Sequence, residues 1–284
     1  MPESLKDSAM RYHTHPTPGK LCIQPTKPLA NKRDLARAYS PGVAYACEAI
    51  VEDESMVAAV TARGNLVGVI TNGTAVLGLG NIGPLASKPV MEGKAVLFKK
   101  FANIDVFDIE IQENDVDKLV DIIASLEPTF GAINLEDIKA PECFLVEKQL
   151  RERMNIPVFH DDQHGTAIVA AAAVYNGLRI VEKDIKDIKV VGSGSGAASI
   201  ACLDLLVSMG LPREHVTLVD RTGVIYKGRE KGMNPWKEAY ALETDDRTLA
   251  DAIVGADLFM GLSAPGVLTQ DMVIAMAPRP LILA

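Results

Sequence analysis

The sequence lacks a long hydrophobic run, a dense cluster of basic residues and an apolar leader, and each absence excludes a class of protein. Its longest apolar run, Ala167–Tyr175, is too short to cross a bilayer, and the first residues contain no signal segment. The net charge of −8 and the absence of a Lys/Arg run argue against a nucleic-acid-binding or membrane-surface protein. We therefore expect a cytoplasmic protein with no nucleic-acid or membrane partner.

Cysteine is also scarce, and its spacing gives no CxxC metal signature. The four cysteines stand far apart, in apolar or mixed segments: Cys22, Cys47, Cys143 and Cys202. This spacing is typical of reduced, buried thiols in a cytosolic protein.

The length of 284 residues suits one large or two ordinary domains, and 48% hydrophobic residues supply ample core. We expect an α/β protein with an N-terminal substrate and metal domain over 1–163 and a nucleotide-binding domain over 164–284. Residues 1–31 are polar and rich in proline. They are expected to form an extended arm that packs on a partner subunit or stays a loose terminus. The nearly all-apolar helix that starts at Gln163 is expected to lie buried between the domains.

The most informative stretch, residues 130–166, contains two short apolar runs that each end in a pair of carboxylates. Gly and Pro flank the runs 131–135 and 156–159, which is typical of buried parallel strands. The segment between them carries a helix start signal and is long enough for a crossover, so the strands are expected to be parallel neighbours. The carboxylates then meet at the sheet edge where ligands bind: Glu136, Asp137, Asp161 and Asp162.

Four carboxylates crowded at one edge would repel one another unless a cation neutralised them. Because oxygen ligands suit Mg²⁺ or Mn²⁺, the stretch favours a divalent metal site. The alternative is that these residues are helix caps or solvated loop charges, since Asp and Glu favour helix N-termini.

Two further side chains are candidates for proton transfer. Lys94 lies among aliphatic neighbours in GKAVLF, and a lysine in a dry setting can act as a general base. Most lysines are instead surface residues. Tyr39 ends a predicted helix over 32–40, just before Pro41, and it is either a packing aromatic or a residue that reaches into a cleft.

A glycine-rich stretch, TNGTAVLGLGNIGP, follows the predicted strand 66–70. Glycines permit tight turns and the close approach of backbone to a ligand. The stretch includes a GxGxxG match at 78–83, but no acidic residue ends a second strand near residue 100, as a nucleotide fingerprint needs. We interpret it as a substrate-side loop whose substrate residues are Thr71, Asn72 and Gly73.

A fuller dinucleotide fingerprint begins at the predicted strand 188–191. A glycine turn opens an apolar helix, and the strand after that helix ends in an acidic residue. The glycines let a pyrophosphate approach the helix N-terminus, whose N–H groups and dipole favour an anion. The expected cofactor residues are Gly192, Gly194, Ser195, Gly196, Ala197, Ala198, Asp220 and Arg221.

Asp220 and Arg221 do not decide between NAD and NADP as the cofactor. Asp220 would bond a ribose 2′-hydroxyl, which favours NAD, whereas Arg221 could meet a 2′-phosphate, which favours NADP.

The remaining pattern is that of an α/β chain. Asn114 is expected to cap a helix whose apolar positions follow the helical period. After Gln163 the pattern gives four strands, at 188–191, 216–219, 257–262 and 281–283. A full nucleotide domain often has six strands, so the second domain is expected to be incomplete at its C-terminal end.

Six ordered motifs resemble those of the bacterial malic enzymes: AYSPGVA, NGTAVLGLGNIGP, MEGKAVLFKKF, INLEDIKAPECF, FHDDQHGTA and the GSGSGAA turn. In particular, the chain resembles the long type, whose members carry a phosphate-acetyltransferase-like C-terminal region. The resemblance covers nearly the whole chain. It implies oxidative decarboxylation of (S)-malate to pyruvate and CO₂ with NADP or NAD and Mg²⁺ or Mn²⁺, and we expect a homo-oligomer.

The resemblance also implies a role for each candidate side chain. Glu136, Asp137 and Asp162 would bind the metal, and Asp161 would hold the charge and hydrogen bonds of the site without touching the ion. The base would be Lys94, and the acid that protonates C3 of the product would be Tyr39.

Two departures from the family leave alternatives open. Larger animal and plant relatives place a substrate-binding arginine in the glycine-rich loop, where this chain has Thr74-Ala75. The family also follows LILA with an Asn-Pro loop and a later asparagine, which this sequence lacks. The chain could therefore be a folded fragment that binds nucleotide or protein partners but turns over poorly. A different class of enzyme, a two-metal hydrolase, could use the four carboxylates with His160 and His164.

Overall fold

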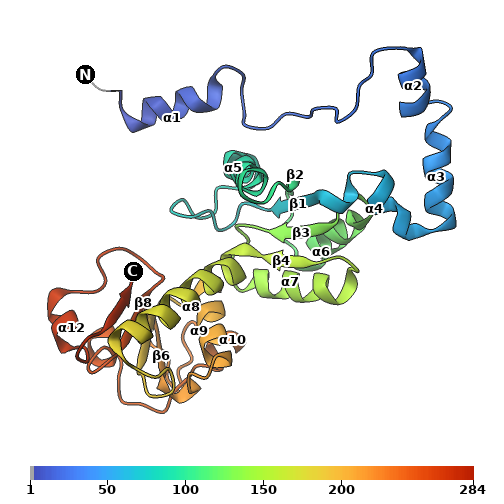
Figure 1. Cartoon of the computed structure of the whole chain (residues 1–284). Coiled ribbons are helices and arrows are strands. Elements are labelled where there is room, and N and C mark those ends of the chain that lie inside the picture. Colours follow the sequence, from blue (N-terminus) through green and yellow to red (C-terminus); the bar gives the residue numbers. More distant parts are fainter. Residues whose placement is uncertain (1–2) are drawn as a thin grey trace. The chain divides into compact units, whose positions relative to one another are not determined.

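The computed structural model describes residues 3–284, which form two compact α/β units (Figure 1). The first unit contains the chain as far as Ile138 together with Val146–Phe159. The second contains Lys139–Leu145 and His160–Ala284. Helix α7, Glu142–Arg153, therefore contributes residues to both units.

The chain begins with helices that bury none of their residues. These are α1 (Leu5–Thr14), α2 (Lys32–Ala38) and α3 (Val43–Glu52). The sequence predicts an extended arm with little core of its own over 1–31. The low burial of residues 3–31 agrees, but the prediction misses α1, which the Ser4 side chain caps. The prediction of four buried thiols is wrong for two of them, because Cys22 and Cys47 are exposed.

The first unit is built on a four-stranded sheet in the order β2-β1-β3-β4. Strand β1 (Leu66–Thr71) lies parallel to both β2 (Asp105–Glu110) and β3 (Ala132–Leu135), and β4 (Val158–His160) is the other neighbour of β3. The prediction that the two runs preceding the acidic pairs are neighbouring strands is therefore confirmed.

Three longer helices and several short ones accompany this sheet in the chain. The longer ones are α5 (Pro84–Ala102), α6 (Val116–Ser125) and α7. The short ones are α4 (Val57–Val60) and the 3₁₀ turns Glu54–Met56, Arg63–Asn65 and Glu127–Thr129. Helix α6 buries the predicted apolar stripe, but its cap is Asp115, whose Oδ1 accepts from Lys118 N, and not Asn114. Both residue types cap well, so composition alone could not choose between adjacent positions.

The second unit is a five-stranded sheet in the order β7-β6-β5-β8-β9. Strands β5 (Val190–Ser193), β6 (Val216–Asp220), β8 (Leu258–Gly261) and β9 (Leu281–Leu283) form parallel pairs. The sequence predicts these four strands. It misses β7 (Gly223–Val224), a two-residue strand antiparallel to β6, which is too short to show a periodic pattern.

The helices of the second unit are α8 (Asp161–Val181), α9 (Ala197–Ser208), α10 (Pro235–Glu238), α11 (Leu249–Ala252) and α12 (Gln270–Ala275), with a 3₁₀ turn at Arg213–His215. Helix α8 begins two residues before Gln163 and is not buried all round. One face packs into the core through Ala167, Ala171, Val174 and Leu178, whereas Ile168, Val169, Tyr175 and Ile180 are exposed. Among residues 3–284, no helix is long and apolar enough to span a membrane.

Candidate active site

The end of β3 carries the first acidic pair in a buried position. Glu136 and Asp137 are both buried, and Glu136 N donates to Ile70 O at 2.9 Å, which continues the sheet by one residue. Asn134, two residues earlier on the same strand, donates its amide to Glu136 Oε2 at 3.0 Å. The carboxylate of Glu136 is thus aimed by a side chain that the sequence analysis did not single out.

Asp137 has a left-handed backbone, with φ of 55°. A non-glycine residue in that region costs about 1–3 kcal/mol unless its surroundings hold it there. The glycine-rich loop does so, because the amides of Thr74 and Ala75 both donate to Asp137 O, at 3.1 and 2.9 Å. The loop therefore fixes the residue that is predicted to bind metal.

Lys94 lies on α5 and forms an ion pair with the end of β3. Its Nζ is 3.0 Å from Glu136 Oε1, and its side chain is only 21% exposed. The next lysines of the same helix behave differently: Lys99 is exposed and pairs with Asp105 at 2.8 Å. The prediction that Lys94 is sheltered is confirmed, whereas its partner Glu136, 42 positions away, was not predicted.

The second acidic pair follows β4 directly and occupies the first turn of α8. Asp161 folds over the next turn, because a Cβ added to Gly165 would collide with the Asp161 carboxylate. Asp162 Oδ2 lies 3.9 Å from Nδ1 of His160, which is fully buried. Both carboxylates thus lie in the first turn of α8, directly after its N-cap residue, His160.

One carboxylate oxygen from each of Glu136, Asp137 and Asp162 lies within 4.8 Å of the others. Strand β4 is the neighbour of β3, so the chain itself brings the residues that follow the two strands to one sheet edge. The donor set is all oxygen and carries three formal negative charges, which fits a hard divalent cation such as Mg²⁺ or Mn²⁺.

The predicted substrate residues stabilise the conformation of the glycine-rich loop. Thr71 Oγ1 accepts from Gly73 N at 2.9 Å, and Asn72 bonds both Thr74 Oγ1, at 2.7 Å, and Glu113 O, at 3.2 Å. Gly73 has φ of 66°, and a side chain there would strike the backbone of Gly83. These three residues shape the loop, and their contact with substrate stays a prediction.

Tyr39 does not lie in a sheltered position. It is the C-cap of α2 and is 71% exposed. Among the residues that the structure describes, only its backbone forms hydrogen bonds, with Tyr39 N donating to Leu35 O and Tyr39 O accepting from Val43 N. The following turn is tight, because a Cβ added to Gly42 would lie 2.5 Å from Ala36 O. The tyrosine is thus held at the corner between α2 and α3 with its hydroxyl open to solvent.

The dinucleotide fingerprint takes the predicted form in the second unit. Gly192 lies within β5, whose four residues are all buried, and Gly194 has φ of 112°, where a side chain would strike Leu262 O. Gly196 is the N-cap of the twelve-residue helix α9, and a Cβ added there would meet nothing within 4 Å. The space beside Gly196, at the N-terminus of α9, is thus open, and pyrophosphate binding by residues 195–198 stays a prediction.

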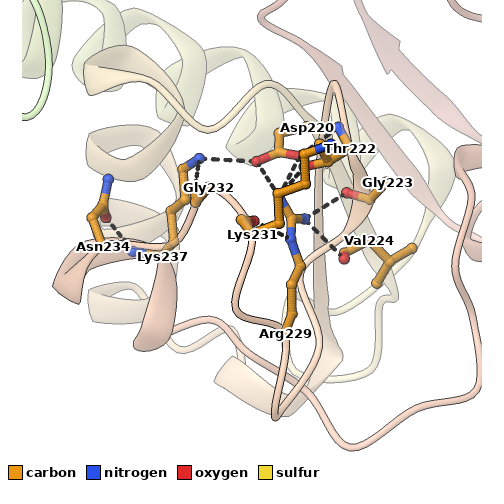
Figure 2. Close-up of polar contacts among 9 residues, drawn as sticks. All are labelled: Asp220, Thr222, Gly223, Val224, Arg229, Lys231, Gly232, Asn234 and Lys237. Atoms are coloured by element: carbon orange, nitrogen blue, oxygen red, sulfur yellow. Dashed lines mark hydrogen bonds and ion pairs between the residues drawn. The ribbon is translucent and has the colours of Figure 1, made fainter.

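Asp220 ends β6 as predicted, but its carboxylate is already bonded by neighbours (Figure 2). Arg229 Nη2 donates to both of its oxygens at 2.7 Å, and Lys237 Nζ donates to Oδ2 at 2.9 Å. Thr222 adds its backbone N–H at 2.9 Å and its hydroxyl at 2.7 Å. Partial burial alone would raise the pKa of the Asp220 carboxyl, but the hydrogen bonds from Lys237, Thr222 and Arg229 hold it well below its usual range.

Arg229 holds this cluster together, because each nitrogen of its guanidinium donates a hydrogen bond to an oxygen. Nη1 donates to Gly223 O and Val224 O, both at 3.0 Å, and Nε donates to Lys231 O at 3.0 Å. Arg221, the predicted 2′-phosphate ligand, follows Asp220 in the chain and is exposed. Sequence reasoning missed Arg229 and Lys237 because they follow Asp220 by 9 and 17 residues in a segment with almost no regular structure.

Comparison with known proteins agrees with this arrangement. Residues 18–151 match the family model of the malic enzyme N-terminal domain, and residues 163–284 match that of the malic enzyme NAD binding domain. The NADP-dependent malic enzyme of Haemophilus influenzae is 65% identical over 285 residues, which is 100% of this chain and 38% of that protein. The NAD-dependent malic enzyme of Rhizobium meliloti is 64% identical over 280 residues, 99% of this chain and 36% of that protein.

Solved structures give the same result. The crystal structure of an NAD-dependent malic enzyme from Thermotoga maritima is 40% identical, with a TM-score of 0.90 over 99% of this chain and 74% of that one. The chain spans less than two fifths of the two bacterial relatives named above. A two-metal hydrolase finds no support in these matches. Two domain models matched in order, together with a solved relative at this identity, show that the chain belongs to the malic enzyme family.

Proposed function

We propose that this protein catalyses the oxidative decarboxylation of (S)-malate to pyruvate and CO₂ with NADP⁺ and a divalent ion. The observation that carries the proposal is the group of three carboxylates, Glu136, Asp137 and Asp162, with Lys94 paired to one of them. Malate and pyruvate are thus the proposed small-molecule partners, and the cytoplasm is the proposed location.

Each candidate residue has a separate role in the proposed reaction. A divalent ion held by the three carboxylates would polarise the C2 oxygen of malate and stabilise the charge that develops there. Lys94 takes the proton of the C2 hydroxyl while the hydride leaves for the nicotinamide, and Tyr39 returns a proton to C3 after CO₂ has left. Asp161, folded over Gly165, holds negative charge at the start of α8 without serving as a ligand.

The metal proposal is tested by replacing one carboxylate. Asp162→Asn keeps the shape of the side chain and removes its charge, so the affinity for Mn²⁺ is expected to fall by at least about 10- to 100-fold. Titration calorimetry with Mn²⁺ alone measures this without relying on turnover. Asp121→Asn is the matched control, because Asp121 is an exposed carboxylate paired with Arg153 on the surface. Unchanged Mn²⁺ affinity in Asp162→Asn would remove Asp162 from the ligand set.

The carboxylate of Asp220 already accepts hydrogen bonds from neighbouring side chains, which supports NADP⁺ over NAD⁺ as the cofactor. One carboxylate faces two cations, Arg229 and Lys237, so the three groups carry a net formal charge of +1. Asp220 has no oxygen without a donor, and bonding a ribose 2′-hydroxyl would require it to give up existing hydrogen bonds. A 2′-phosphate would instead be attracted by the two cations, and Arg221, next to Asp220 in the chain, is exposed.

Lys237→Gln is expected to weaken NADP⁺ binding by about 10- to 100-fold, because a charge-assisted hydrogen bond to phosphate is lost. NAD⁺ binding should change by less than about threefold, because NAD⁺ brings no phosphate to that place. Equilibrium titration with each nucleotide measures both values. Lys227→Gln is the control, since Lys227 is an exposed lysine of the same segment. Equal loss for both nucleotides would make Lys237 a structural residue only.

We also propose that the chain forms a homo-oligomer through its N-terminal helices. Residues 3–52 expose an unusual number of large apolar side chains, among them Leu5, Ile23, Leu29, Tyr45 and Val51. Apolar surface of this kind is typical of a segment that packs on another subunit. Enclosure of this segment would also shelter Tyr39, as an acid catalyst requires.

A further inference from the structure

Trp236 is the only tryptophan of the chain, and its ring stacks on Phe144. The ring centroids are 4.5 Å apart and the planes differ by 25°. Both residues belong to the second unit, and both pack on its larger core cluster. The stack therefore joins two segments that are far apart in the sequence.

Each ring is tied by a short stretch of chain to a different part of the proposed site. Phe144 lies in the first turn of α7, seven residues after Asp137. The intervening turn is held by Cys143 N to Lys139 O, at 2.9 Å, and by Phe144 N to Pro141 O, at 3.2 Å. A shift of the carboxylate-bearing turn would thus be passed to Phe144.

Trp236 is adjacent to Lys237, whose Nζ bonds Asp220 Oδ2 at 2.9 Å and Gly232 O at 2.7 Å. The helix that carries both residues, α10, has only four residues and cannot be stable by itself. Its position depends on the Asn234 cap, on the bonds of Lys237 and on the ring of Trp236 against Phe144.

We propose that Phe144 is a positioning residue that couples the metal carboxylates to the ribose end of the cofactor site. Through its stack on Trp236 it fixes α10, and α10 places Lys237 beside Asp220. Metal binding at residues 136–137 then favours NADP⁺ binding, and NADP⁺ favours metal binding by the same factor. This inference rests on the proposed function, because it assumes that both ligands bind.

The test uses the fluorescence of Trp236 and direct NADP⁺ titrations on the whole chain. Mg²⁺ alone is expected to change the emission of Trp236 in the wild-type protein and to tighten NADP⁺ binding. Phe144→Leu should lose the emission change and bind NADP⁺ about 2- to 10-fold more weakly, the range for one lost aromatic pair. In this variant Mg²⁺ should no longer alter the NADP⁺ affinity. Phe144→Tyr keeps the ring and should restore all three properties.

Phe259→Leu is the matched control, because Phe259 is a fully buried phenylalanine in the other core cluster of the same unit. It should lower the melting temperature without changing the response to Mg²⁺. If Phe144→Leu keeps the wild-type coupling, or if Phe259→Leu loses it equally, the stack is only core packing and the inference is wrong. If calorimetry shows that the wild-type chain binds neither Mg²⁺ nor NADP⁺, the proposed function fails as well.

Discussion

Replacing Lys94 with alanine is expected to abolish malate oxidation and to leave divalent-metal binding intact. Nζ of Lys94 lies 3.0 Å from Glu136 Oε1, beside the carboxylates proposed to hold the ion, and as a neutral amine it would take the proton of a C2 hydroxyl bound there. Loss of a general base typically costs about 10²- to 10⁴-fold in rate. Steady-state oxidation of malate with NADP⁺ and Mn²⁺ measures the loss, and titration with Mn²⁺ alone shows that the ligands remain.

The same variant distinguishes two roles of Lys94, that of a general base and that of a cation that only balances the charge of Glu136. Without Lys94, the buried Glu136 loses the cation that faces its carboxylate, so the free energy of unfolding should fall by about 1–3 kcal/mol. Added Mg²⁺ should recover that stability, because the ion replaces the lost positive charge. Lys99→Ala is the control on the same helix, since Lys99 is exposed and paired with Asp105. Near-normal turnover in Lys94→Ala would show that Lys94 only balances the charge of Glu136.

The parts of the fold that could be predicted are those with a local cause. The apolar runs before Glu136 and Asp161 give β3 and β4, and the glycine turn after β5 gives the start of α9. Hydrophobic periodicity and the flexibility of glycine act within about ten residues, so the sequence displays them. The acidic residues at the ends of neighbouring strands then follow from the rule for parallel sheets.

The parts that could not be predicted depend on side chains meeting across long separations. Lys94 finds Glu136, and Arg229 and Lys237 reach Asp220 from an irregular segment that has no periodic signal. These contacts change the predicted cofactor. An aspartate at the end of β6 by itself suggests NAD, whereas its two cationic partners favour NADP. Similarly, the hydrogen bonds of the Asn72 side chain to Thr74 and Glu113 could not be predicted, and its contact with substrate stays a prediction.

Tyr39→Phe is expected to separate the two halves of the reaction. If the Tyr39 hydroxyl only protonates C3, it serves the last chemical step and takes no part in hydride transfer. Overall decarboxylation of malate should then fall by about 10²- to 10⁴-fold, the usual contribution of general acid catalysis. Reduction of oxaloacetate or a pyruvate-like keto acid with NADPH should continue. Because the ring is 71% exposed and its hydroxyl makes no hydrogen bond within residues 3–284, the free energy of unfolding should change by less than about 0.5 kcal/mol.

Tyr45→Phe is the matched control for this prediction, because Tyr45 is an exposed tyrosine on the next helix, α3. Both half-reactions should be measured for both variants under the same metal and cofactor concentrations. An equal loss of both half-reactions in Tyr39→Phe would make Tyr39 a residue that positions substrate. No loss in either half-reaction would make it a surface or interface residue, and the acid would then be another group. A selective loss of decarboxylation would instead place the exposed corner between α2 and α3 in the working active site. Since that corner is open to solvent in the single chain, such a result would also require that it be enclosed during catalysis.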